Sequence, residues 1–267
     1  MKRLALAALA AALALPMSAE AHRQWLLPSM TVLSGDDPWV TVDAAVSNDL
    51  FVFEHVPMRL DQLTITGPDG AKVEPQNAST GKYRSVFDVH LAKPGTYRIA
   101  SAGVGTSASY KLGGETKRWR GPAADLAKAI PAEATEVKIN ESVRRVETFV
   151  TAGAPTTEAL KPTGVGLELQ PVTHPTDLYA GEAAKFRLLM DGKPAADVEV
   201  TVAPGGVRYR DDRGEMTLKT DAAGEFSVTW PTAGFWWLEA SSRGGQASIP
   251  NAQRSAMYVA TVEVLKN

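Results

Sequence analysis

Four histidines and the absence of cysteine limit the metal and catalytic chemistry that this 267-residue chain can offer. The histidines are His22, His55, His90 and His174. Without a thiolate, a bound metal ion would need imidazole, carboxylate, thioether or main-chain ligands. The sequence also contains neither a Gly-x-Ser-x-Gly elbow nor a His-Glu-x-x-His pair, either of which would indicate a hydrolase. We therefore assign no catalytic residue and treat the histidines as candidate metal ligands.

Residues 1–21 have the pattern of a secretory signal peptide. A positive start at Lys2 and Arg3 is followed by an apolar run over residues 4–15. Ala19-Glu20-Ala21 then gives the small-x-small pattern that signal peptidase recognises. The apolar run is shorter than the ~20 residues that a membrane-spanning helix needs, which favours cleavage over anchoring. We therefore expect the mature chain to begin at His22 and to act in the periplasm.

Cleavage after Ala21 would give His22 a free α-amine beside its own imidazole. The amine nitrogen and Nδ1 can chelate one metal ion, and a second histidine completes the arrangement called a histidine brace. Such nitrogen ligands suit copper and also accept nickel or cobalt. The α-amine has a reference pKa of about 8, so it yields its proton to a metal more easily than a lysine does. The alternative is a terminal histidine left by chance, but the apolar segment Trp25–Pro28 favours a terminus packed on the body.

His55 is predicted to be the second histidine of the site. Glu54 and Met58 lie close to it in sequence and could add a carboxylate and a thioether ligand. The other interpretation is a loop histidine bonded to main chain. His90 is a further candidate ligand, although its place in an alternating strand favours a solvated side chain. His174 is predicted to be structural.

Most of the chain consists of alternating segments separated by turn sequences. A period of two in the apolar residues is typical of strands with one buried face. In Gly67-Pro68-Asp69-Gly70, proline presets one dihedral and glycine supplies a positive φ. The clearest alternating segments are Trp39–Val46, Leu63–Thr66, Val86–Leu91, Thr96–Ala100, Ala184–Met190, Val198–Val202, Phe226–Trp230 and Met257–Val264. Together they predict an all-β fold.

The order of these segments predicts two immunoglobulin-like β-sandwich domains. Residues 22–155 form the first domain, with a partly irregular insertion in which Ala123–Ile130 is expected to be a short helix. A stretch rich in Ala, Thr and Pro indicates a short linker, set at residues 156–164, before the second domain at residues 165–267. The adjacent residues Trp236 and Trp237 point to opposite faces of a strand, so one is expected in the core and the other at the surface.

Several segments resemble a known bacterial family. The stretch His22-Arg23-Gln24-Trp25-Leu26-Leu27-Pro28-Ser29 resembles the mature opening of the domain of unknown function 4198 family. Further matching stretches are residues 43–51, 91–97, 146–155 and 167–182, so the resemblance covers nearly all of the mature chain. Residues 192–240 also resemble the carboxypeptidase-regulatory or transthyretin-like sandwich.

The resemblance implies a periplasmic protein that handles metal. Members of the family are described as the periplasmic component of nickel or cobalt uptake systems, which implies metal binding rather than catalysis. Transport would need a separate membrane transporter or outer-membrane receptor, because no segment after residue 21 is apolar enough to span a bilayer. The formal net charge of −2 argues against a nucleic-acid partner, which favours a basic protein surface.

We therefore predict a non-enzymatic periplasmic protein that binds a transition metal, nickel or cobalt first and copper second. His22 and His55 are the predicted ligands, and Glu54, Met58 and His90 are the additional candidates. Two alternatives remain open from the sequence. One is an envelope adaptor whose sandwiches bind a protein or a glycan with no metal role, and the other is a copper-dependent oxidative enzyme built on the brace.

Overall fold

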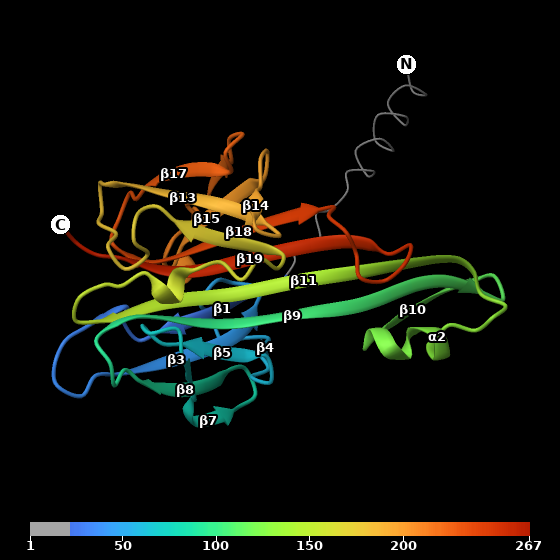
Figure 1. Ribbon diagram of the computed structural model, residues 1–267, viewed down its shortest axis with the longest axis horizontal. Coiled ribbons are helices and arrows are strands. Elements are labelled where there is room, and N and C mark those ends of the chain that lie inside the picture. Colours follow the sequence, from blue (N-terminus) through green and yellow to red (C-terminus); the bar gives the residue numbers. More distant parts are fainter. Residues whose placement is uncertain (1–21) are drawn as a thin grey trace, which may run out of the picture.

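The computed structural model describes residues 22–267, so the predicted signal peptide at residues 1–21 lies outside the described part of the chain. Within this part, β-strands form three sheets. Figure 1 shows a long central sheet with a smaller sheet on each side of it. The all-β sandwich fold class predicted from the alternating segments is therefore confirmed.

The central sheet contains strands from both halves of the sequence. β11 (Thr135–Ala152) pairs in parallel with β19 (Gln253–Val264) and antiparallel with β9 (Gly95–Leu112). The other strands of this sheet are β2 (Val32–Leu33), β5 (Leu63–Thr66), β6 (Lys72–Val73), β10 (Glu115–Gly121), β15 (Glu199–Pro204), β16 (Met216–Lys219) and β18 (Gly234–Arg243).

The two outer sheets come from the two halves separately. The first contains β1 (Arg23–Pro28), β3 (Trp39–Ser47), β4 (Val56–Pro57), β7 (Gln76–Thr80) and β8 (Ser85–His90). The second contains β12 (Leu167–Pro171), β13 (Ala183–Met190), β14 (Lys193–Pro194) and β17 (Glu225–Thr229). Short helical segments lie in the connections: η1 (Ala123–Asp125), α2 (Leu126–Ala129), η2 (Glu158–Leu160) and η3 (Val207–Tyr209). None of the helices in residues 22–267 has the length and apolarity needed to cross a bilayer.

Alternation along the central strands sends successive side chains into two separate cores. Trp236 and Trp237 of β18 are each only 2% exposed. Trp236 belongs to the core beneath the second outer sheet, where it contacts Trp230, whereas Trp237 belongs to the core beneath the first. The prediction that one of the two would lie at the surface is therefore wrong, because a sheet covered on both faces buries both alternating sets.

The two predicted domains share one sheet. The predicted linker at residues 156–164 does connect the last strand of the first half, β11, to the first strand of the second half, β12. The pairing of β11 with β19, however, joins the two halves by a ladder of main-chain hydrogen bonds. The expectation of two sandwiches joined only by a linker needs this correction, because alternation identifies the buried face of a strand but not its neighbour.

A buried cluster of charged residues fastens the connection after β11 to the central sheet. Arg145 of β11 lies 3.5 Å from Glu147 and 3.3 Å from Glu168 of β12. The Tyr258 hydroxyl of β19 donates to Glu147 at 2.7 Å. Burial raises the pKa of the Glu147 carboxyl, while the Arg145 charge acts in the opposite direction. Glu168 accepts the backbone N–H of Thr163 at 2.8 Å, so the connection is held to both strands.

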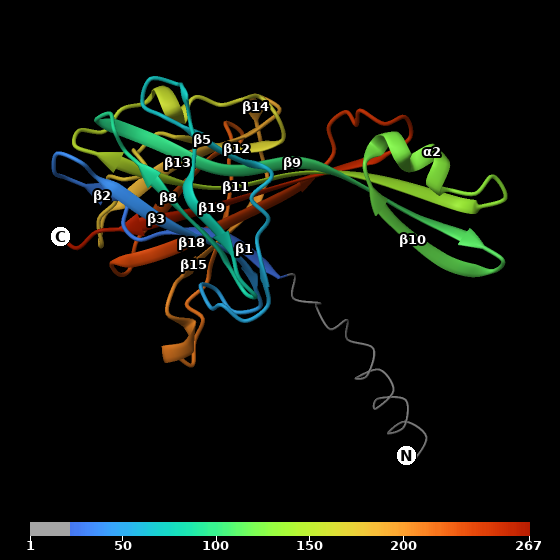
Figure 2. The same cartoon turned by 90° about the horizontal axis from the view of Figure 1, so that it is seen from below.

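An arm projects beyond the three layers at one end (Figure 2). It consists of the outer part of β9, the whole of β10 and the first part of β11, joined by η1 and α2. The short helix expected at Ala123–Ile130 lies here. The insertion thus combines paired strands with a non-strand connection, and the β9–β11 pairing has a register shift between Thr135 and Lys138.

A cut in the connection between the two halves should leave them together. We predict that a protease site placed in the exposed turn at residues 153–155, once cleaved, leaves a single species on size-exclusion chromatography. The reason is that the β11–β19 ladder crosses the cut. Urea should separate the fragments, and uncleaved protein in the same urea series is the control. Two separately folded fragments in buffer alone would contradict the shared sheet.

Candidate functional site

The structure places His22 and His55 next to each other. His22 directly precedes β1, in which Arg23 pairs with Ser47 of β3. His55 directly precedes β4, which pairs with the same end of β3 on the other side. The two imidazole rings are stacked with centroids 4.0 Å apart and planes inclined by 12°. Both side chains are exposed, so the two predicted metal ligands form a pair on the surface.

A buried tryptophan packs the chain segment next to this pair into the core. Trp25 of β1 is 0% exposed and contacts the rings of Phe51 at 5.5 Å and Phe53 at 5.3 Å. Its Nε1–H donates to Ser47 Oγ at 2.9 Å, and that hydroxyl donates to the carbonyl of Asp49 at 2.6 Å. The loop that carries His55 is thus tied to the strand that follows His22. The sequence-based expectation that the apolar segment Trp25–Pro28 packs on the body is confirmed.

Glu54 organises the loop before His55. Its Oε1 accepts the backbone N–H groups of Asn48 at 2.6 Å and Asp49 at 3.0 Å. The hydrogen bond from Asp49 is the main cause that lowers the pKa of Glu54, and a charge on His55 lowers it further. The carboxylate is therefore ionised at neutral pH and places negative charge beside the histidine pair. Its Oε1 is already used by the two backbone N–H groups.

Met58 does not lie at the site in a position to bind metal. Its side chain is only 6% exposed and belongs to the core beneath the first outer sheet. Its backbone N–H donates to Ala44 of β3 at 3.2 Å, which fixes the residue against the sheet. The suggestion of a thioether ligand therefore needs correction. Proximity in sequence was misleading here because the chain stays paired with β3 at Met58 and buries this side chain in the core.

His90 lies at the far end of β3 from the histidine pair. It is paired with Trp39, the first residue of β3, whereas His22 is next to the partner of Ser47, the last residue. With a rise of about 3.3 Å per residue, the two ends of this strand are roughly 26 Å apart. The His90 ring stacks on Trp39 at 4.4 Å, and its Nε2 lies 2.6 Å from Asp37 Oδ1. His90 therefore lies too far from the histidine pair to bind the same ion, which corrects the prediction that it is an additional ligand.

His174 is held within hydrogen bonds of the fold. Its Nδ1 accepts the backbone N–H of Thr176 at 3.3 Å, so the ring proton belongs on Nε2. That nitrogen lies 3.1 Å from both the Thr156 carbonyl oxygen and the Thr96 hydroxyl. This network matches the structural role expected from the sequence.

The second half of the chain also supports the site, through contacts that no sequence motif predicts. Arg23 forms an ion pair with Glu215 at 2.5 Å, across 192 residues of sequence. The Arg23 guanidinium also lies 5.0 Å from the ring centroid of Trp237. The indole N–H of Trp237 in turn donates to the Gln24 carbonyl at 3.0 Å. Contacts between residues this far apart in sequence cannot be predicted from a local sequence pattern.

The histidine pair lacks a third side-chain ligand of the usual types. Among residues 22–267, no group of three or more His, Cys, Asp or Glu side chains is arranged to hold a metal ion. Two imidazoles that meet at the amino end of β1 are therefore the donor set that the described side chains provide. A third nitrogen could come from the α-amine of His22 if the chain is cleaved before it.

The chain belongs to the family described as domain of unknown function DUF4198. The match covers residues 19–244 and so includes β1, the loop of His55 and most of both halves. It confirms the family resemblance seen in the sequence, and the family description itself names no ligand or activity. No curated protein matches the chain.

Solved structures with some likeness share little sequence with the chain. The D0-D1 domain of intimin is 14% identical, with a TM-score of 0.22, over 90% of this chain and 97% of that one. Native alpha-2-macroglobulin from Escherichia coli, domains MG0-NIE-MG1, is 10% identical with a TM-score of 0.21, over 90% and 72%. A marsupial T cell receptor is 8% identical with a TM-score of 0.21, over 91% and 73%. TM-scores this low say nothing about binding or activity.

Removing the hydroxyl that links Trp25 to the loop should destabilise the protein. We predict that Ser47→Ala lowers the free energy of unfolding by about 1–3 kcal/mol, because the buried Trp25 N–H loses its acceptor. Urea unfolding followed by tryptophan fluorescence measures this. The exposed Ser34→Ala serves as the control and should change the value by less than about 0.5 kcal/mol. Equal effects of the two changes would show that the Trp25–Ser47 bond does not stabilise the fold.

Proposed function

We propose that this protein binds a transition metal ion in the periplasm through His22 and His55, with nickel or cobalt preferred and copper next. The observation that carries the proposal is the stacking of the two exposed imidazoles at 4.0 Å, from residues that lie on opposite sides of β3. Imidazole nitrogens are ligands that suit all three metals. In this proposal the protein binds and presents the ion and catalyses no reaction.

The α-amine of His22 supplies the third donor in this proposal. In the full-length chain the His22 nitrogen is part of a peptide bond to Ala21 and is a poor ligand. Cleavage after Ala21 frees an amine that can chelate together with the imidazole of the same residue. This requirement fits the donor count, because the described side chains provide two imidazoles and no third ligand. Processing and metal binding are therefore coupled.

The two rings must tilt before they can share one ion. A metal lies near the plane of each imidazole that binds it, at about 2.0–2.1 Å from the nitrogen. Rings inclined by only 12° have lone pairs in nearly parallel planes, so one or both side chains must rotate. Both are exposed, and the core beneath them need not move. The ionised Glu54 favours a cation here because its negative charge lies beside His55.

Delivery of the ion is proposed to involve a membrane transporter or an outer-membrane receptor. The site is at the surface, so an ion held there is open to direct transfer to another protein's ligands. A terminal amine and two imidazoles also lose metal readily when protons or better ligands compete. These properties suit a carrier more than a permanent structural metal site.

The amino terminus of the mature protein tests the first requirement of the proposal. We predict that protein purified from the periplasm begins at His22, because Ala19-Glu20-Ala21 is the expected cleavage site. Intact-mass measurement gives the terminus directly. A replacement of Ala21 by a large residue should shift or block cleavage and serves as the control. A mature chain that starts at any other position would remove the chelating amine and the proposed site with it.

Metal titration tests the ligands themselves. We predict that His55→Ala weakens binding of nickel, cobalt and copper to the mature protein by at least about tenfold, or 1.4 kcal/mol, because one of three donors is lost. Acetylation of the amino terminus should have a similar effect, and binding should weaken as the pH falls because protons compete for the same lone pairs. Isothermal titration calorimetry measures both.

His90→Ala is the matched control for this titration, since it removes a histidine at the other end of β3 and should leave the affinity unchanged. Equal metal affinity of the wild-type, His55→Ala, acetylated and His90→Ala proteins would show that the metal binds elsewhere. Binding no tighter than about 0.1 mM, equivalent to roughly 5.5 kcal/mol, would exclude a carrier role and favour the envelope-adaptor alternative.

A further inference from the structure

The projecting arm leaves one face of the central sheet without an outer layer. β9, β10 and β11 continue past the end of the first outer sheet, and β19 runs beside β11 up to the root of the arm (Figures 1 and 2). Side chains on this face are therefore exposed or half-buried, whereas the same strands are buried closer to the centre. Side chains on this face do not pack in the core. Their residue types can therefore be suited to binding a ligand.

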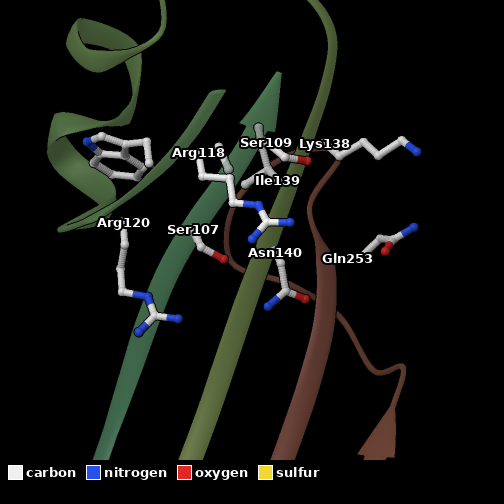
Figure 3. A pocket seen from close by; sticks show the side chains of 10 residues that line it. Ser107, Ser109, Arg118, Arg120, Lys138, Ile139, Asn140 and Gln253 are labelled. Atoms are coloured by element: carbon white, nitrogen blue, oxygen red, sulfur yellow. The ribbon is translucent and has the colours of Figure 1, made fainter. Parts of the chain in front are cut away.

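A hollow of about 560 Å³ lies on this face where the four strands come together (Figure 3). Its size falls within the range of about 300–1,000 Å³ that small-molecule sites occupy. The labelled polar side chains around it offer cations, hydroxyls and amides, and no carboxylate lines it. The lining residues that the argument uses are Ser107, Ser109, Arg118, Arg120, Lys138 and Asn140.

Strand register explains why the cations gather there. Arg118 and Arg120 lie two positions apart on β10, opposite Ser109 and Ser107 of β9. Lys138 of β11 lies opposite the other side of the same Ser109. Paired residues of adjacent strands share a face, so three cations from two strands lie on the same face as two hydroxyls. The arrangement is fixed by main-chain pairing and does not depend on flexible loops.

The same face continues inward with a further cation, Arg144 of β11. Its Nη2 lies across Gly105 of β9, where an added Cβ would be only 3.4 Å away. Burial is the main cause that lowers the pKa of Arg144, and the positive charge of Arg120 lowers it further. Arginine remains protonated at neutral pH in spite of such shifts, so two like charges face one another here.

The three cations of the hollow and the neighbouring Arg144 have no counter-charge within residues 22–267. Neither Arg118, Arg120, Lys138 nor Arg144 forms an ion pair or a side-chain hydrogen bond with any described residue. Elsewhere on the arm, lysines are neutralised: Lys111 pairs with Glu136 at 2.7 Å and Lys117 with Glu115 at 2.5 Å. The arm therefore carries both ion-paired lysines and cations without an ion pair. The two kinds lie on different strand faces or at different positions along the strands.

We propose that this hollow binds a ligand that carries phosphoryl groups, through Arg118 and Arg120 with support from Lys138. A guanidinium presents two parallel N–H donors that match the oxygens of a phosphate, and a phosphoryl group carries a charge of about −1.5 to −2. A single carboxylate would leave most of the positive charge uncompensated. The Ser107 and Ser109 hydroxyls and the Asn140 amide can donate to the remaining oxygens. This site is separate from the histidine pair and does not rest on the metal-binding proposal.

Calorimetry with inorganic pyrophosphate tests the site, in the presence of a chelator so that no metal can bridge the anion to the histidines. We expect wild-type protein to bind, and Arg118→Gln to weaken binding by about tenfold, because one charge-assisted contact is lost. Lys117→Gln is the matched control. It removes the same charge from the adjacent position of β10, but on the opposite strand face, and should leave the affinity unchanged. Both positions are exposed, so both variants are expected to fold, which circular dichroism verifies.

Vesicle sedimentation then distinguishes a free phosphorylated molecule from a lipid headgroup. Phosphatidylcholine vesicles with and without phosphatidylglycerol are the two samples. Binding to pyrophosphate alone supports a free ligand, and Arg118-dependent sedimentation with the anionic vesicles supports a headgroup. Absence of binding in both assays would overturn the proposal. An equal loss in Lys117→Gln and Arg118→Gln would also overturn it, because the effect would then be one of overall charge.

Discussion

The parallel pairing of β11 with β19 is the contact on which the rest of the architecture depends. It runs from Asn140 opposite Gln253 to Thr148 opposite Thr261 and turns strands from both halves into one sheet. The two outer sheets cover the shared sheet on its two faces, with one hydrophobic core beneath each of them. The buried Arg145–Glu147–Tyr258 cluster lies within the same pairing. The β11–β19 pairing thereby places the two cores on either side of one sheet.

The histidine pair depends on this shared sheet although it lies at the edge of the first outer layer. Trp237 lies on a central strand of the second half, yet it packs in the core beneath β1 and bonds to the Gln24 carbonyl. Glu215 reaches Arg23 from the same half. The position of His22 is thus specified by residues that follow it by about two hundred positions. A truncated first half would lack these supports.

Local patterns in the sequence encode the strands and the packed start of the described chain. The alternating segments identified most strands, and the apolar Trp25–Pro28 segment correctly indicated that the start of the described chain is packed. The pair His22–His55 was proposed from ligand chemistry, and the structure brings it together. Met58 and His90 lie away from the pair, because Met58 is buried in the core and the length of β3 separates His90 from it. Neither fact has a local sequence signal. The shared sheet was missed because side-chain period carries no information about which strand lies alongside.

The place of β19 in the sheet also sets the order in which the protein can fold. Thr148 and Thr261 are in direct contact across 113 residues of sequence. Until residues 253–264 have been synthesised, β11 keeps one long open edge, and exposed edges of this kind invite pairing with other chains. Contacts between such distant segments also form slowly, since a large loop must close first. The central sheet of the nascent first half therefore remains incomplete until β19 has been synthesised. Until then, the open edge of β11 needs protection from aggregation.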